Sequence, residues 1–201
     1  MYQNIDRSNI CDSIFHMLTL ESISYILNKK IENKQKVYEI EGLGAHLGER
    51  IANHLLNNNN STTSSAKMEV DEIMKFLGRD VWLFLFGKQI SKLQTNRKGT
   101  FLIDCDEIKF HHLLITEKAG QEEILEIVLS FVAGVIKGVL SAFNVEGGVT
   151  AGFKSGPIVG TMFTLASNGI ETKGGQNLPQ SLPQSLTFSY SFTINLSSHN
   201  I

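Results

Sequence analysis

Cysteine is scarce in this chain, which has only Cys11 and Cys105 among its 201 residues. Two distant cysteines cannot form the disulfide framework of a small secreted domain or the four-ligand site of a structural zinc ion. The N-terminal stretch MYQNIDRSN is polar and lacks a basic segment followed by an apolar one, so no secretory signal is predicted. These absences together favour a reducing, cytosolic setting.

An excess of charge of either sign is also missing. Twenty acidic and 18 basic residues give a net charge near −2, and 42% of the residues are hydrophobic. This balance argues against a nucleic-acid-binding protein or one that binds anionic membranes directly. The length fits one domain that can bury its own core.

Catalytic motifs are absent as well. The sequence has no phosphate-binding glycine loop, no nucleophile elbow and no C-x-x-C pair. His111 and His112 are adjacent on a predicted strand and so point to opposite faces. His46 and Glu49 have the spacing of two metal ligands, but no second pair accompanies them, and a solvated helix face explains them better. We therefore expect no enzyme, no metal and no cofactor, and we favour a binding or scaffolding role.

Apolar periodicity predicts four main helices, over about residues 9–30, 38–56, 68–86 and 121–143. The first is apolar nearly all round, which indicates burial from more than one direction, by a partner chain as well as by its own core. The alternative is a fully internal helix in a monomer. The third helix carries the densest aromatic region and is expected at the centre of the core.

The second helix combines an apolar stripe with two glycines. Leu43, Leu47 and Ile51 recur every four residues, and Gly44 and Gly48 lie beside them. A glycine inside a helix costs roughly 1 kcal/mol against alanine. We therefore expect another backbone to pass close to this surface.

The run FVAGVIKGVLSAF, residues 131–143, is the most apolar helical segment. A membrane span needs about 20 mostly apolar residues, whereas Glu126 and Lys137 leave only ten uncharged residues between them. The segment is therefore predicted to be a core helix. Gly134 and Gly138 should lie close on the protein's own sheet or third helix, with Lys137 pointing away.

Two β-hairpins are predicted. Residues 100–104 and 108–115 are joined by DCDE, and residues 145–154 and 158–165 are separated by SGP. Residues 57–67 are rich in Asn, Ser and Thr and predict a surface loop.

The composition changes beyond residue 166. Residues 167–185 contain the repeat LPQSLPQSL and are expected to be poorly ordered. Residues 186–196 alternate apolar and polar side chains, which predicts either an added edge strand or an exposed aggregation-prone segment. The predicted division is a domain over 1–166 and a low-complexity tail over 167–201.

Five stretches form a pattern that resembles the small subunits of the TRAPP (transport protein particle) tethering complex, and most closely the subunit-6 class. They are LGERI at 47–51, KFLGRDVW at 75–82, KQISKLQTN at 88–96, KGTFLI at 98–103, and FVAGVIKGVL with GGVTA within 131–151. The residues that carry this pattern, called the signature residues below, are Glu49, Arg50, Trp82, Lys88, Gln89, Asn96, Gly99, Gly134 and Gly138.

The resemblance implies an α+β fold, in which a twisted antiparallel four-stranded sheet of two hairpins is covered on one side by about four helices. It also implies a non-catalytic scaffold of a vesicle-tethering complex in ER-to-Golgi transport, located in the cytoplasm at cis-Golgi and ER membranes. Other subunits would catalyse nucleotide exchange on a Rab GTPase, so this chain would meet the GTPase and the membrane only through the complex.

The implied direct partner is a subunit-3 class protein, bound through the first two helices, and other small TRAPP subunits would assemble around the pair. The residues expected at this interface are Ile14, Met17, Leu18, Leu43, Gly44, Leu47, Gly48 and Ile51. The subunit-3 class carries an acylated cysteine before its third helix. This chain has NNNNSTTSSAKM there, so acylation is not expected.

One alternative function stays open, because distant relatives of this fold bind haem or hydrophobic ligands between helices and sheet. The glycines of the fourth helix would leave room for such a ligand, although no histidine lies in the third or fourth helix to bind a haem iron. Whether the chain also homodimerises, and which form of the complex it joins, are open too.

Overall fold

The computed structural model describes residues 7–58, 68–96, 98–106, 108, 121–155, 162–166, 169–173 and 189–197. Side chains are described from residue 17 onward in the first helix, and not for residues 58, 121, 153–155, 162–166 and 169–173. The part of the chain expected to form a surface loop, 57–67, lies outside the described residues from 59 onward.

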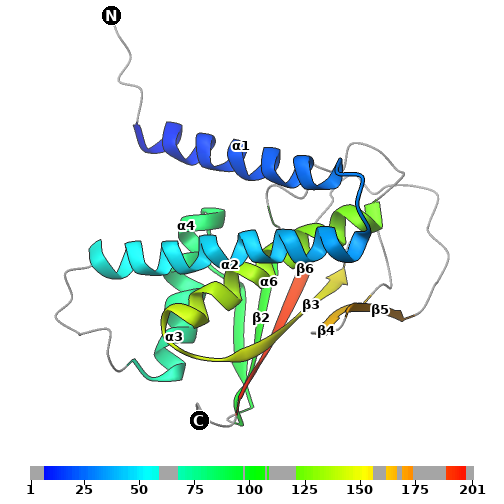
Figure 1. Cartoon of the computed structure of the whole chain (residues 1–201). Coiled ribbons are helices and arrows are strands. Elements are labelled where there is room, and N and C mark those ends of the chain that lie inside the picture. The colour runs from blue at the N-terminus through cyan, green and yellow to red at the C-terminus, as the bar shows by residue number, and fades with distance from the viewer. Residues whose placement is uncertain are drawn as a thin grey trace, which may run out of the picture.

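All four predicted helices are present (Figure 1). The first two are α1, Arg7–Leu27, and α2, Asn33–Asn58. The third is continuous but mixed, with α3 at Val70–Phe76, a π-helical turn η2 at Leu77–Val81 and α4 at Trp82–Phe86. The fourth is α6, Gln121–Ala142.

The ends of the third helix follow from its local sequence. Asp71 and Glu72 lie in the first turn, where the helix dipole favours negative charge, and the Glu72 carboxylate accepts a hydrogen bond of 3.4 Å from the Glu69 N–H. Gly87 ends the helix at φ 69°, a left-handed conformation that glycine adopts without steric cost. The chain then turns toward the sheet.

The main sheet has four antiparallel strands in the order β1-β2-β6-β3, which confirms the predicted α+β class. Their bounds are Lys92–Thr95 for β1, Thr100–Asp106 for β2, Gly147–Ser155 for β3 and Ser189–Leu196 for β6. A separate two-stranded sheet joins β4, Met162–Ala166, to β5, Gly169–Lys173.

The first hairpin differs from the prediction. It pairs β1 with β2 around residues 96–99, and the first three residues of DCDE, 104–106, belong to strand β2 instead of a turn. The turn is fixed by the Asn96 side-chain oxygen, which accepts hydrogen bonds from the N–H groups of Lys98 (2.8 Å) and Thr100 (3.1 Å). Gly99, at φ 82°, supplies the positive φ that this turn needs. The predicted partner, 108–115, lies outside the described residues except for Ile108.

The second predicted hairpin gains partners that the sequence did not indicate. β3 pairs with β6, whose residues come from the predicted tail, and 162–166 pair with β5 and also lie in contact with β3. β6 is neither an edge strand nor an exposed segment, because it lies between β2 and β3 and buries Tyr190, Phe192 and Ile194. The predicted boundary at residue 166 thus excludes the strand at the centre of this sheet. Most of the stretch expected to be poorly ordered, 167–185, lies outside the described residues, namely 167–168 and 174–185.

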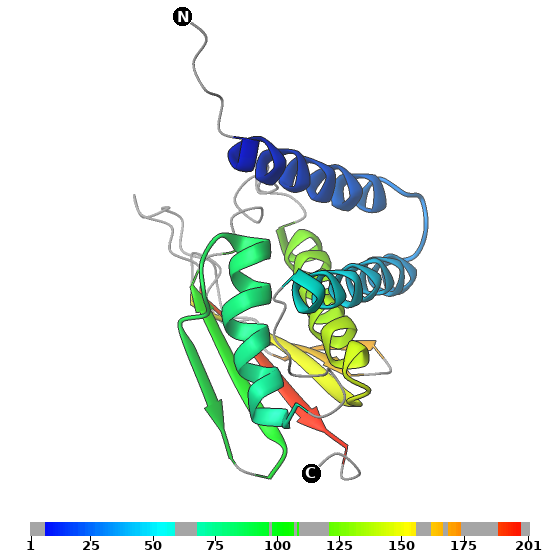
Figure 2. The ribbon, with the colours of Figure 1, turned by 90° about the vertical axis from the view of Figure 1, so that its left-hand side faces the viewer.

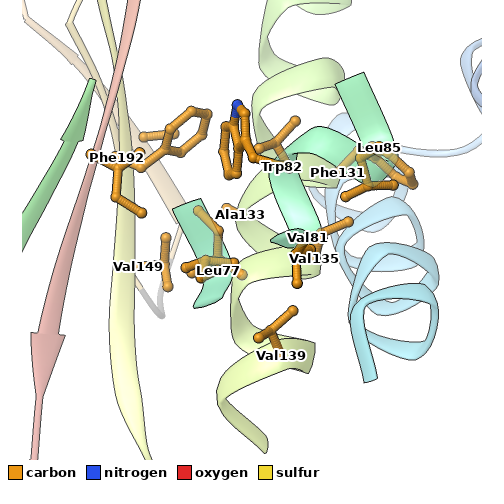
Figure 3. Close-up of a cluster of buried hydrophobic side chains, with 14 of the residues drawn as sticks. Leu77, Val81, Trp82, Leu85, Phe131, Ala133, Val135, Val139, Val149 and Phe192 are labelled. Carbon is orange, nitrogen blue, oxygen red and sulfur yellow. The ribbon is translucent and has the colours of Figure 1, made fainter. Parts of the chain in front are cut away.

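The helices cover one face of the sheet (Figure 2). The third helix packs directly on it, as predicted for the centre of the core. The Trp82 ring meets the Phe192 ring of β6 at 5.9 Å between centroids (Figure 3). Within the third helix it also lies 4.9 Å from the Phe86 ring. Leu83 and Phe84 of the same helix are the exceptions, since both remain about half exposed.

Helix α6 is the central element of the helical layer. Its segment Glu122–Ala142 has the length and hydropathy of a membrane span, yet 78% of its most apolar window is buried inside the fold. Val132, Val135, Ile136 and Val139 are fully buried between the other helices and the sheet. The burial fits the prediction of a core helix, and length with composition alone does not make this segment a membrane span.

Candidate partner-binding site on the first two helices

The inner face of α2 is closed by a glycine crossing, in which Gly44 and Gly48 lie against Gly134 and Gly138 of α6. A Cβ atom at Gly44 would clash with the Phe131 carbonyl oxygen, and one at Gly48 with that of Val135. The relation is reciprocal, because Cβ atoms at Gly134 and Gly138 would clash with carbonyl oxygens of α2. The two backbones therefore touch, as expected for glycines spaced four apart on both helices.

This crossing corrects several predictions. Gly44, Gly48 and Ile51 were expected at a partner interface, but they face the protein's own interior, and Leu47 is half-buried against the same core. Gly134 and Gly138 contact α2 and not the sheet or the third helix. Lys137 does not point away either, because its ammonium forms an ion pair with Glu41 of α2.

A second ionic contact ties α2 to α6. The Lys36 side chain is buried, and its Nζ donates to Glu123 Oε1 and to the Leu27 carbonyl oxygen, both at 2.8 Å. This lysine thus joins the end of α1, the start of α2 and the start of α6. Nearby, partial burial and the charge of Glu123 raise the pKa of Glu126.

The outer face of α2 is open. Together with α1 it forms a groove of about 880 Å³, and both views show α1 at the outside of the helical layer (Figures 1 and 2). The residues that line the groove are Leu18, Glu21, Ser22, Tyr25, Ile26 and Lys29 of α1, with Tyr38, Glu39, Glu41, Gly42, Leu43, Ala45 and His46 of α2.

Large apolar side chains rim this groove and are exposed to an unusual degree. Leu18 is 63% exposed, Tyr25 64%, Tyr38 80% and Leu43 40%. Met17, next to the groove on α1, is 69% exposed. Grouped apolar exposure of this kind is typical of protein–protein interfaces.

Some residues of the predicted interface are therefore exposed in the groove, whereas others are buried in the protein's own core. Met17, Leu18 and Leu43 are available to a partner, and the side chain of Ile14 lies outside the described residues. Sequence analysis missed Tyr25 and Tyr38. Tyrosines flanking a short connection between two apolar helices were the available clue, since amphipathic aromatic residues are enriched at interfaces.

The charges in the groove are mostly paired. Lys29 Nζ lies 2.6 Å from Glu39 Oε2 and 5.3 Å from the centre of the Tyr25 ring, and the hydrogen bond to Glu39 raises the pKa of Lys29. Glu41 is held by Lys137 from behind. Glu21 is exposed, and within the described part of the chain it forms no ion pair.

The signature residues mostly serve the fold. Trp82 fills the core, Asn96 and Gly99 build the β1–β2 turn, and Gly134 and Gly138 make the crossing with α2. The remaining four are Glu49, Arg50 and Gln89, which are exposed, and Lys88, which is half-buried.

The described residues include a free cysteine, Cys105, which is buried. Burial raises the pKa of Cys105 to about 12, so its thiol stays protonated at neutral pH and is a poor acyl acceptor. Among the residues the structure describes, no three His, Cys, Asp or Glu side chains gather as a metal site would require.

Comparison with known proteins gives these features a family context. Residues 15–165 match the family described as transport protein particle (TRAPP) component. The chain is 31% identical over 152 residues to trafficking protein particle complex subunit 6B of Mus musculus, covering 73% of this chain and 91% of the relative. The human subunit 6B is 29% identical over 153 residues, again covering 73% of this chain and 91% of the relative.

A solved structure resembles the whole fold. It is a trafficking protein particle complex subunit 3 from Naegleria fowleri, covalently bound to palmitic acid, with a TM-score of 0.63 at 13% identity. The likeness covers 94% of this chain and 97% of that chain, and at this identity it shows the fold alone. The family match over most of the chain, together with the subunit-6 relatives, shows that this protein belongs to the TRAPP component family, in its subunit-6 class, and is a TRAPP complex subunit.

Proposed function

We propose that this chain is a non-catalytic scaffold of the TRAPP vesicle-tethering complex and that it binds a subunit-3 class protein through the groove between α1 and α2. It would act in ER-to-Golgi transport, in the cytoplasm beside cis-Golgi and ER membranes. Nucleotide exchange on the Rab GTPase would belong to other subunits.

The observation that carries this proposal is the apolar exposure around the groove. Leu18 and Tyr25 of α1 face Tyr38 and Leu43 of α2 across an opening that the protein's own core does not fill. A stable protein interface buries about 1,200 Å² or more of accessible surface. A partner covering both helices would bury these four side chains and provide such an area.

The alternative of a ligand held between helices and sheet loses its main support. It rested on room left by Gly134 and Gly138, and that room is taken by the α2 backbone, with which any Cβ at these positions would clash. A retained lipid-sized or haem-sized mass in native mass spectrometry of the purified protein would revive this alternative.

The proposal is tested by co-expression with the subunit-3 class protein of the same organism. We expect the wild-type pair to co-elute in size-exclusion chromatography. Leu18→Glu should weaken the pair by about tenfold to a hundredfold, because it places a charge in an apolar contact, while the thermal midpoint stays unchanged.

The matched control is Asn53→Glu, which adds the same charge at an exposed position of α2 that does not line the groove. This control should pair as the wild type does. Failure of the wild type to co-elute would refute the partner assignment, and equal pairing of Leu18→Glu would refute the surface.

A further inference from the structure

Lys36 is a buried charge at a position where a helix disfavours a cation. It lies in the first turn of α2, and the helix dipole favours negative charge there. The residue is only 8% exposed, whereas lysine is almost never fully buried unless its charge is paired. Helix formation alone therefore does not explain a lysine here, and its role must come from the groups that it contacts.

The contacts of Lys36 join three elements. Its Nζ lies 2.8 Å from the carbonyl oxygen of Leu27, the last residue of α1, and 2.8 Å from Glu123 Oε1 in the first turn of α6. The last carbonyls of a helix have no partner within it, and a cation there is favoured by the helix dipole as well. Glu123 balances the charge of the lysine. Lys36 thus ties the C-terminal end of α1 to the body of the fold.

The apolar attachment of α1 is narrow. In the part of α1 whose side chains are described, only Thr19, Ile23 and Ile26 are buried. This helix makes few contacts with α2 and α6 compared with those that α2 and α6 make with each other. The crossing of α2 with α6 is built from backbone contacts in which α1 takes no part. A shift of α1 would therefore leave that crossing intact.

We infer that Lys36 is a positioning residue, which holds α1 in the orientation that keeps the groove open, and that α1 can loosen without unfolding of the core. Lys36 does not line the groove, so it acts on the groove only through Leu27 and the rest of α1. The groove depends on this orientation because Leu18 and Tyr25 come from α1, whereas the opposite wall comes from α2.

The consequence for partner binding rests on the proposed function. A partner that covers both walls meets them together only in those molecules whose α1 is held in place. The apparent affinity then falls with the fraction of molecules in that state.

Hydrogen–deuterium exchange of the whole chain, without a partner, tests the inference. Lys36→Met keeps an unbranched side chain but removes the charge and its donors, and it should speed exchange over residues 17–27 of α1 by about tenfold. Peptides from the middle of α6, over residues 128–140, should exchange as in the wild type. Lys34→Met is the matched control, because Lys34 is exposed in the same turn of α2, and it should change neither segment.

Glu123→Ala tests the same coupling from α6. It leaves Lys36 in place but removes the carboxylate that balances the lysine, so α1 should loosen although the substitution lies on another helix. Exchange over 17–27 should rise about threefold to tenfold. Glu122→Ala, at the exposed neighbouring position, should have no such effect.

Two results of the exchange experiment would overturn the inference. One is unchanged exchange over residues 17–27 in both Lys36→Met and Glu123→Ala. The other is a rise of equal size over 17–27 and 128–140, which would mean that Lys36 supports the whole fold and not the position of α1.

Isothermal titration with the subunit-3 class protein tests the consequence for binding. Lys36→Met should weaken binding about threefold to tenfold, since fewer molecules present the complete groove. If a variant with faster α1 exchange binds this partner as tightly as the wild type does, α1 need not be held and the inference fails. A wild type that does not bind the partner would refute the proposed function, and the exchange of the variants would still decide whether Lys36 positions α1.

Discussion

The two faces of α2 both carry apolar and small residues, but one face is buried and the other is exposed. One face, with Gly44, Gly48 and Ile51, is closed by backbone contact with α6. The other, with Tyr38 and Leu43, opens into the groove beside α1. Apolar and small residues at helical spacing therefore indicate that another element packs on that face of the helix. They do not indicate whether that element belongs to the same chain or to a partner.

A glutamate introduced on each face should give the largest difference in the free energy of unfolding between the two faces. Ile51→Glu buries an unpaired carboxylate and should lower the free energy of unfolding by about 3–5 kcal/mol, which threatens folding itself. Leu43→Glu, eight residues earlier on α2, should change the free energy of unfolding by less than about 1 kcal/mol, but it should weaken partner binding. Urea unfolding of both variants measures this difference, and equal destabilisation would mean that the groove face is not free.

A matched glycine pair tests the comparison with the smallest chemical change. Gly48→Ala must push α2 away from the Val135 carbonyl oxygen and should cost about 1–3 kcal/mol. Gly42→Ala meets no neighbour and should stabilise the protein by about 0.5–1 kcal/mol, since alanine is the better helix former. Thermal unfolding separates the two. A stabilising Gly48→Ala would show that the crossing is not in backbone contact.

A smaller effect concerns a carboxyl at the start of α6, on the closed side. Partial burial and Glu123 raise the pKa of Glu126 above that of the unfolded chain. The charged form is thus disfavoured in the folded state, so its cost is full above the folded-state pKa and disappears as the pH falls below the unfolded-state pKa.

Glu126→Gln removes this cost and should stabilise the protein at pH 7 by less than about 0.5 kcal/mol, given the partial exposure of the group. The advantage should shrink as the pH falls toward 4. Urea titrations at both pH values check the trend, and a variant that is less stable at pH 7 would contradict it.

Local patterns predicted the helices well and the strand partners poorly. Helical periodicity depends on residues three and four apart, so the four helices could be placed to within a few residues at most ends. β6 reaches β3 only after 33 intervening residues, and a pairing over such a distance leaves no local trace. The alternation that ends in Leu196 predicted a strand without saying where it pairs. The family match, which ends at residue 165, also stops before this strand.

The candidate site was predicted in its location but not in all its residues. The excess apolar surface of the first helix indicated a partner, and the family resemblance indicated the first two helices. Gly44 and Gly48 could not be assigned to one face, because a glycine pair fits a neighbouring helix of the same chain and a helix of another equally well. Tyr25 and Tyr38 could not be assigned to the site from sequence, because only the folded α1–α2 connection brings them to the same groove.

Hydrogen–deuterium exchange of this chain, alone and bound to the subunit-3 class protein, tests the central claim most directly. Binding through the groove predicts slower exchange in peptides that cover residues 17–46 of α1 and α2. It also predicts unchanged exchange in peptides from α4, β1 and β2, over residues 82–106. Protection confined to 82–106, with no change over 17–46, would contradict the account.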